Sequence, residues 1–182
     1  MGFCLLASLS SPARAKFFST MIGGGLASGD RIGKNLNTLH NYGMFRLATS
    51  IHKKHPLFAS IDIETLRIQR DENLLPDHHY GEAGGFSLGV RDNNYAVWFQ
   101  AMSGRLRTLL FTADGFEDKG KRYAYQSTAL GASYPVYKRT YSSVDLQLIH
   151  KLMIVERGWK NTYGYKNLQM TSLVFSFTLH DI

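Results

Sequence analysis

The stretch Leu173-Val174-Phe175-Ser176-Phe177-Thr178-Leu179-His180 indicates the fold class of this chain. Large apolar side chains alternate in it with smaller or polar ones, and successive side chains of a strand point to opposite faces. The alternation therefore predicts a β-strand with one face packed against a core. Such a strand must be docked, because alone it would be an exposed edge that invites aggregation.

Length and composition exclude several classes of protein. The chain has 182 residues, 44% of them hydrophobic and 13% aromatic, which excludes a disordered tail and allows one domain with an extension. Its single cysteine, Cys4, cannot form an intramolecular disulfide. No apolar run reaches the roughly 18 residues that a membrane-spanning helix needs. The net charge of +7 suggests an anionic partner.

The first fifty residues differ in composition from the rest. Residues 1–29 lack Asp and Glu but carry Arg14, Lys16 and several serines, which is typical of an organellar transit peptide. The alternative, which we favour, is an arm that docks on a neighbouring subunit. Gly23-Gly24-Gly25 predicts a flexible break, and apolar residues at spacings of three and four predict a helix over residues 32–45. We thus expect an N-terminal arm and helix over 1–50.

The remaining residues, 51–182, are expected to form a β-rich domain. Alternating or apolar runs bounded by turn residues predict strands at 61–68, 86–90, 106–113, 122–128, 144–156 and 168–179. A short apolar run at 95–102 predicts one short helix. The expected fold class is mainly β within α+β, an antiparallel sheet or small barrel. A membrane β-barrel is not favoured, because only about six strands and no standard secretory signal are recognisable.

Candidate catalytic and metal sites are weak throughout the sequence. No Gly-x-Ser-x-Gly elbow is present, and a glycine-rich segment at 29–35 has Asn35 where a phosphate loop needs Ser or Thr. The pairs His52/His55 and His78/His79 lie in polar, turn-like stretches and lack a recognisable ligand set. A small enzyme or metal protein using these pairs is the least favoured class. We predict no enzymatic activity, no cofactor and no metal.

Two segments interleave basic and aromatic residues, Lys121-Arg122-Tyr123-Ala124-Tyr125 and Tyr137-Lys138-Arg139-Thr140-Tyr141. Tyrosines flanked by cations on a sheet can stack bases while the cations neutralise phosphates. Possible nucleic-acid or partner contacts are accordingly Arg122, Tyr123, Tyr125, Lys138 and Arg139. The alternative, which we favour, is that the tyrosines pack across strands and the basic residues form a solvated face.

The order of elements over residues 58–159 resembles the tube-forming subunits of contractile phage tails and their Hcp-type secretion relatives. The segments that carry this resemblance are Ser60-Ile61-Asp62-Ile63-Glu64-Thr65, the loop around Pro76, Phe86-Ser87-Leu88-Gly89-Val90-Arg91, Tyr95-Ala96-Val97-Trp98-Phe99-Gln100, residues 107–112, the polar hairpin at 114–120, residues 121–126, and Ala132-Ser133-Tyr134-Pro135-Val136-Tyr137. The resemblance covers a little over half the chain and includes no invariant chemical signature.

The resemblance implies a non-enzymatic structural subunit that assembles into a ring or tube of a phage-tail-like particle. Its partners would be copies of itself and neighbouring tail or baseplate proteins, in the virion or in the host cytoplasm during assembly, with no membrane span. The alternative expectation is an accessory structural subunit of a mitochondrial complex or ribosome, with possible RNA contacts.

Overall fold

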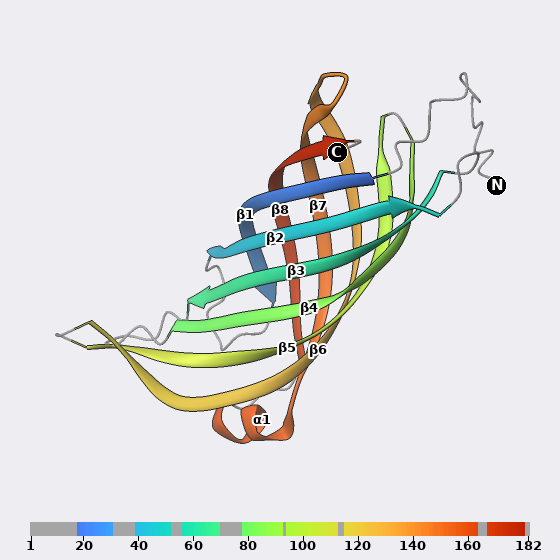
Figure 1. The fold of residues 1–182 in the computed structure, drawn as a ribbon. Helices are drawn as coiled ribbons and strands as arrows, with labels where there is room; N and C mark the ends of the chain where they lie inside the picture. Colours follow the sequence, from blue (N-terminus) through green and yellow to red (C-terminus); the bar gives the residue numbers. More distant parts are fainter. Residues whose placement is uncertain are drawn as a thin grey trace, which may run out of the picture.

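A closed antiparallel barrel accounts for nearly all of the structure that is described (Figure 1). The computed structural model describes residues 18–30, 39–51, 56–69, 78–92, 94–112, 115–163 and 167–180. The elements are β1 (Phe18–Asp30), β2 (Leu39–Ser50), β3 (Leu57–Gln69), β4 (His78–Arg91), β5 (Ala96–Thr112), β6 (Gly115–Lys138), β7 (Ser142–Val155), α1 (Arg157–Tyr163) and β8 (Asn167–His180).

Each strand pairs with its neighbour in the sequence, and β8 pairs back onto β1. In that closing pair Ile22 lies opposite Phe177. Closure gives each strand of the barrel wall a partner on both sides, which is how barrels avoid exposed edges.

The two ends of the barrel differ. One end, here called the termini end, carries the start of β1, the end of β8 and the connections β2–β3, β4–β5 and β6–β7. The other, here called the loop end, carries α1 and the tip of the β5–β6 hairpin (Figure 1). Residues 110–112 of β5 pair only with residues 115–117 of β6, because β4 pairs with β5 only up to Leu109 and β7 pairs with β6 only from Tyr125. Residues 119–121 fall in the register shift of the β5–β6 pair. The hairpin therefore projects beyond the barrel wall.

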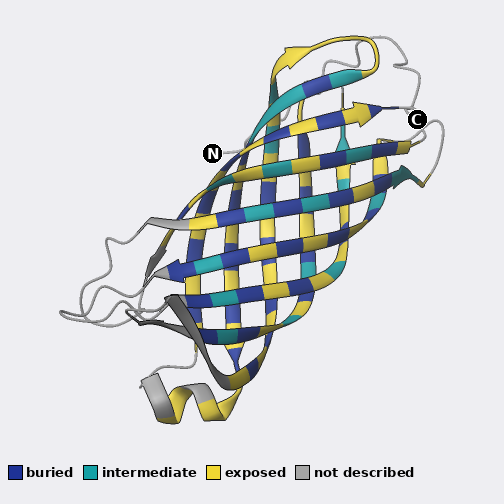
Figure 2. Ribbon diagram, turned by 60° about the vertical axis from the view of Figure 1, so that its left-hand side comes forward, coloured by how far each residue is buried: buried dark blue, intermediate teal, exposed yellow. Residues whose placement is uncertain are grey.

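Burial alternates along most of the length of the strands (Figure 2). On β8 every even-numbered residue is buried and every odd-numbered residue is exposed. The buried set includes Ser172, Ser176 and Thr178, whereas the exposed set includes Phe175 and Phe177. The predicted strand is confirmed, but the expectation that its apolar face packs on a core is wrong, since that face points out of the barrel.

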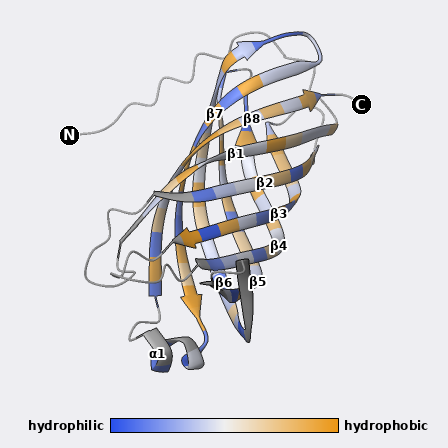
Figure 3. Ribbon diagram, turned by 90° about the vertical axis from the view of Figure 1, so that its left-hand side faces the viewer, coloured by the Kyte–Doolittle hydropathy of each residue, from blue (hydrophilic) through white to orange (hydrophobic). Residues whose placement is uncertain are grey.

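The same inversion holds around the wall, and hydropathy alternates with it along the strands (Figure 3). We call the large hydrophobic side chains exposed in the middle of the wall the apolar belt. Its members include Ile22, Leu47, Ile61, Ile63, Phe86, Leu88, Val97, Phe99, Leu130, Leu148, Leu173, Phe175 and Phe177. Exposed aromatic residues also gather near the termini end, namely Phe18, Tyr95, Tyr134, Tyr137 and Tyr141.

The inside of the barrel is packed with large side chains as well as polar ones. Trp98, Tyr125, Leu106 and Ile149 are fully buried there. Gly131 of β6 lies directly against Trp98, and a Cβ at Gly131 would overlap the indole ring. The glycine therefore provides the space that the largest interior side chain occupies.

Several predicted elements differ in the structure. The predicted N-terminal helix is wrong, because residues 39–50 form β2, with Tyr42, Met44 and Arg46 alternating inward. Residues 1–17 of the predicted arm and residues 31–38 lie outside the described residues. The predicted short helix at 95–102 is wrong too, because it belongs to β5. Strands on both sides of residue 50 pair within the same barrel.

The glycine triplet is part of a strand as well. Gly23, Gly24 and Gly25 lie in the middle of β1, although we predicted a flexible break there. A Cβ at Gly25 would overlap the carbonyl oxygen of Leu173 on β8. The absent side chain thus permits a close approach of β1 to β8, and the barrel closes at this point.

Candidate functional site: a charged interior behind an apolar wall

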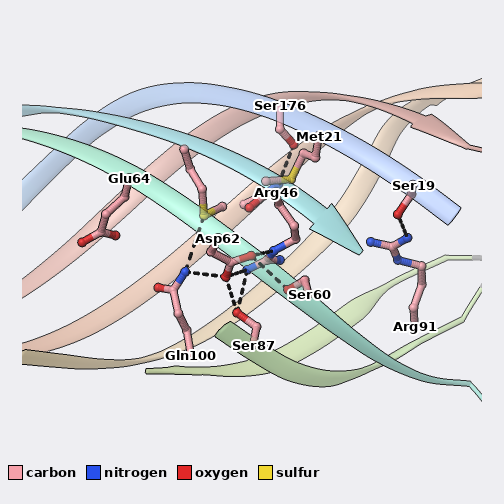
Figure 4. Close-up of polar contacts among 12 residues, drawn as sticks. Ser19, Met21, Arg46, Ser60, Asp62, Glu64, Ser87, Arg91, Gln100 and Ser176 are labelled. Atoms are coloured by element: carbon pink, nitrogen blue, oxygen red, sulfur yellow. Dashed lines mark hydrogen bonds and ion pairs between the residues drawn. The ribbon is translucent and has the colours of Figure 1, made fainter. Parts of the chain in front are cut away.

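A buried ion pair forms between two neighbouring strands inside the barrel. Arg46 of β2 and Asp62 of β3 are directly opposite in register and both point inward. Arg46 Nε donates to Asp62 Oδ1 at 2.7 Å and Nη2 donates to Oδ2 at 2.9 Å, a bidentate arrangement (Figure 4). The guanidinium carbon also lies 4.4 Å from the centroid of the Trp98 ring. The cation is therefore held both by a carboxylate and by an aromatic face.

Asp62 collects further donors from other strands. Ser60 Oγ donates to Oδ1 at 2.9 Å, and Gln100 Nε2 of β5 donates to Oδ2 at 2.7 Å. The hydroxyl of Ser87 on β4 also donates to Oδ2, and it accepts from Arg46. The carboxylate thus joins β2, β3, β4 and β5 into one hydrogen-bonded network (Figure 4).

A second buried ion pair crosses the inside of the barrel. Lys151 of β7 pairs with Glu64 of β3, two strands that are not neighbours in the wall. The hydroxyl of Tyr42 donates to Glu64 Oε2 at 2.8 Å, and that of Tyr125 lies 3.4 Å from Oε1. Near the termini end, Arg91 Nη1 of β4 donates a hydrogen bond across the lumen to Ser19 Oγ of β1 at 2.7 Å. These bridges fill the lumen with side chains from opposite walls.

The interior chemistry is that of paired charges. Both buried carboxylates, Asp62 and Glu64, are neutralised by a cation and hydrogen-bonded to several donors. Across the described residues, no group of three or more His, Cys, Asp or Glu side chains is placed to hold a metal ion. His79 is buried, with Nδ1 3.1 Å from Thr108 Oγ1, while His52 and His55 lie outside the described residues. The paired and hydrogen-bonded charges therefore stabilise the barrel by joining its strands.

The residues predicted as partner contacts are separated in the structure. Tyr123 and Tyr125 point into the barrel, and Tyr125 contacts Glu64. Arg122 is exposed near the loop end, whereas Lys138 and Arg139 are exposed at the termini end. The two basic-aromatic segments occupy opposite ends of the long strand β6, so they do not form one surface. Their contact with a partner stays a prediction.

The interior charges were not singled out from the sequence, although a signal was present. Asp62 and Glu64 alternate with Ile61 and Ile63, and Arg46 stands between Phe45 and Leu47. A charged residue repeated at period two between large apolar ones indicates a strand whose polar face is enclosed. This pattern identifies interior charges only if the apolar side chains of the strand are taken to face outward.

Comparison with known proteins identifies the fold. No protein-family model matches the sequence, and no curated protein matches it. Among solved structures, Ail, the attachment invasion locus protein of Yersinia pestis, superposes with a TM-score of 0.62 at 8% identity, covering 91% of this chain and 99% of Ail. The structure of Ail in complex with the heparin analogue sucrose octasulfate superposes with a TM-score of 0.59 at 8% identity, covering 90% of this chain and 97% of Ail.

Neisserial surface protein A (NspA) is similar to the same degree. It superposes with a TM-score of 0.59 at 11% identity, covering 89% of this chain and 96% of NspA. Ail and NspA are eight-stranded outer membrane β-barrels. At these identities the likeness establishes the fold, which is that of a small closed barrel. In the described part of the chain, no helix has the length and apolar character needed to cross a membrane.

These comparisons correct the functional expectations. The predicted resemblance to phage-tail tube subunits is wrong, as are the predicted virion, tail-tube and baseplate roles, because the structural neighbours are outer membrane barrels. The mitochondrial or ribosomal alternative and the predicted locations are wrong for the same reason. The predicted homo-oligomeric ring without a membrane span is also wrong, because the structural neighbours are eight-stranded outer membrane barrels, which are usually monomeric.

Proposed function

We propose that this protein is a monomeric, membrane-embedded β-barrel whose wall faces lipid and whose interior is filled by side chains. The observation that carries the proposal is the inverted distribution of polarity. Ile61, Leu130 and Phe175 are 66%, 62% and 58% exposed, whereas Arg46 and Asp62 are 2% and 0% exposed. In water such a wall would far exceed the apolar patches of a few hundred Å² that soluble monomers tolerate.

The backbone geometry supports the same location. A bilayer offers no hydrogen-bonding partners to the backbone, so β-structure crosses it only as a closed barrel. Strands β1 to β4 have 13, 12, 13 and 14 residues, more than the roughly 9–11 that a tilted spanning strand needs. The exposed aromatic residues near the termini end match the interfacial girdle of such barrels. The likeness to Ail and NspA supports the outer membrane as the location.

The filled interior favours a role other than transport or catalysis. The interior of an eight-stranded barrel is just wide enough for its side chains, and here Lys151–Glu64 and Arg91–Ser19 bridge opposite walls. The projecting β5–β6 hairpin is then the part best placed to meet a partner beyond the bilayer. We infer a non-enzymatic barrel that displays this hairpin, in keeping with the name of Ail, an attachment invasion locus protein.

Refolding tests this proposal. Urea-unfolded protein is diluted into phosphatidylcholine vesicles and, separately, into buffer without amphiphile. We expect β-sheet circular dichroism, protease resistance and a faster-migrating unheated band in electrophoresis only with lipid. A stable fold in buffer alone would contradict membrane insertion, and a steady conductance in planar bilayers would contradict the filled interior.

A further inference from the structure

Three arginines and a tyrosine form one continuous row across the outer wall near the loop end. In register, Arg67 of β3 is paired with Tyr80 of β4, Tyr80 with Arg107 of β5, and Arg107 with Arg122 of β6. The residues on both sides of Arg67, Tyr80 and Arg107 are buried, namely Leu66, Ile68, His79, Gly81, Leu106 and Thr108, and Arg122 itself is exposed beside buried Tyr123. Strand alternation therefore places all four side chains outside the barrel. We call this set the arginine row.

The row lies at the edge of the apolar belt. Along β3 the outward positions run Ile61, Ile63, Thr65 and Arg67, so one neutral residue separates the last isoleucine from the first arginine. If the belt lies in hydrocarbon, as we propose, the row lies at the depth of the lipid head groups. Long cationic side chains at this depth extend readily toward the polar layer.

Positive charge exceeds negative charge around the arginine row. Exposed Arg105 lies next to it on β5, and Glu82 is an acidic neighbour, 3.4 Å from Arg107 Nη2. Exposed Lys121 adjoins Arg122, and exposed Glu156 is joined to Ala124 of β6 by a backbone hydrogen bond. Among the described side chains of this part of the wall, five cations thus stand against two carboxylates. Like charges directly opposite each other destabilise a sheet, and Arg107 stands opposite Arg122. An anion bound at this point would relieve that repulsion.

The aromatic residue of the row orders two of its cations. The guanidinium carbons of Arg67 and Arg107 lie 5.7 and 6.0 Å from the centroid of the Tyr80 ring. The ring therefore stands between them as a shared cation–π partner. Guanidinium groups present paired N–H donors that match the oxygens of a phosphate.

A hollow in the wall adjoins the row. It has a volume of about 310 Å³, and its lining includes Gly43, Thr65, Arg67, Tyr80 and Glu82. Gly43, an outward position of β2, adds no side chain to this hollow, and a Cβ there would lie 2.8 Å from Thr65 Oγ1. The hollow gives a bulky head group room beside the cations.

We propose that the arginine row binds the phosphate-bearing head group of an anionic lipid whose acyl chains lie along the apolar belt. The proposal rests on the membrane location argued above. In this proposal Arg122, predicted from the sequence as a possible nucleic-acid or partner contact, contacts a lipid head group. A lipid fits better than a soluble anion because the row continues directly into the belt.

The test compares two variants that lose the same charge at opposite ends of the barrel. Arg107→Gln/Arg122→Gln removes two cations from the row, and Lys138→Gln/Arg139→Gln removes two at the termini end. Urea unfolding is measured in phosphatidylcholine vesicles with and without phosphatidylglycerol. We expect the anionic lipid to raise the folding equilibrium constant of wild type and of the termini-end variant about tenfold at roughly ten times its dissociation constant. The row variant should gain less than half of that factor.

The outcomes separate this proposal from the one it rests on. An equal gain in both variants would overturn the row as the site, whereas failure of wild type to fold in phosphatidylcholine would overturn the membrane location. If the double row variant folds poorly, Arg122→Gln alone, at an exposed position, replaces it.

Inositol hexakisphosphate is added in detergent as a soluble probe. Stabilisation by it as large as that by phosphatidylglycerol would overturn the assignment to a lipid.

Discussion

At the scale of single residues, stability depends on charges that are buried together. Asp62 accepts from Arg46, Ser60, Ser87 and Gln100, so its loss would leave a buried guanidinium with no counter-charge. A buried ion pair is costly to break from one side, although replacing both partners by apolar groups is often neutral.

We expect Asp62→Ala to lower the free energy of unfolding by about 3–5 kcal/mol, measured by urea titration in micelles. Adding Arg46→Met should recover much of this loss, because the orphaned charge is then gone. Glu82→Gln, which breaks the exposed pair with Arg107, should cost less than about 1 kcal/mol. A loss as large for the exposed pair as for the buried one would contradict the enclosed network.

Glycine positions provide a second test at this scale. We expect Gly131→Ala to lower the unfolding midpoint, because the new methyl overlaps the Trp98 indole, and overpacking costs about 1–3 kcal/mol. Gly24→Ala on β1 is the matched control, since its Cβ would lie 3.7 Å from the nearest atom, the carbonyl oxygen of Tyr42. The unfolding midpoints of both variants are compared by thermal unfolding in one detergent. Equal midpoints would argue against a tightly filled interior.

At the scale of elements, the sequence predicted strands better than their orientation. The alternation of residues 168–179 identified β8 correctly, yet its phenylalanines face outward. Alternation alone does not say which face is enclosed, because that depends on whether the solvent is water or lipid. The predicted helix over residues 32–45 is wrong where it overlaps β2, because apolar residues at spacings of three and four also fit a helix. The partner strands that select β2 lie elsewhere in the chain.

We expect Phe175→Arg, in the middle of the apolar belt, to destabilise the inserted barrel by about 2–4 kcal/mol. Gln169→Arg on the same face of β8, near the loop end, should cost no more than about 1 kcal/mol. Urea titration in phosphatidylcholine vesicles measures both. Similar costs at the two positions would mean that the wall has no hydrocarbon-facing centre.

The projecting hairpin is expected to be dispensable for folding. Replacing residues 110–117 by Asn-Gly joins Leu109 to Asp118, which are already paired, and preserves every pairing of β5 with β4 and of β6 with β7. The shortened protein should keep the heat-dependent mobility shift and the unfolding midpoint of wild type. Failure to form the barrel would show that the hairpin does more than display a surface.

At the scale of the whole molecule, the sequence alone did not predict that the barrel closes or which side chains meet inside it. The Arg46–Asp62 pair needs the register of β2 against β3, whereas Lys151–Glu64 joins residues 87 apart on opposite walls and needs the closed barrel. Only about six strands were recognisable, because glycine-rich β1 and helix-like β2 carried misleading local signals. The resemblance to tail-tube subunits failed since an order of short strands is shared by many β folds and includes no site chemistry.

The central claim is that the exposed apolar wall faces lipid, and spin-label accessibility along β8 tests it most directly. Single cysteines replace outward residues Gln169, Leu173, Phe175, Phe177 and Leu179 in a Cys4→Ser background, and the labelled proteins are refolded into phosphatidylcholine vesicles. We predict high collision rates with oxygen and low rates with a water-soluble nickel complex at Phe175 and Phe177, and the reverse at Gln169. Ready access of the nickel complex at all five positions, or exclusion of both reagents by a neighbouring protein, would contradict the claim.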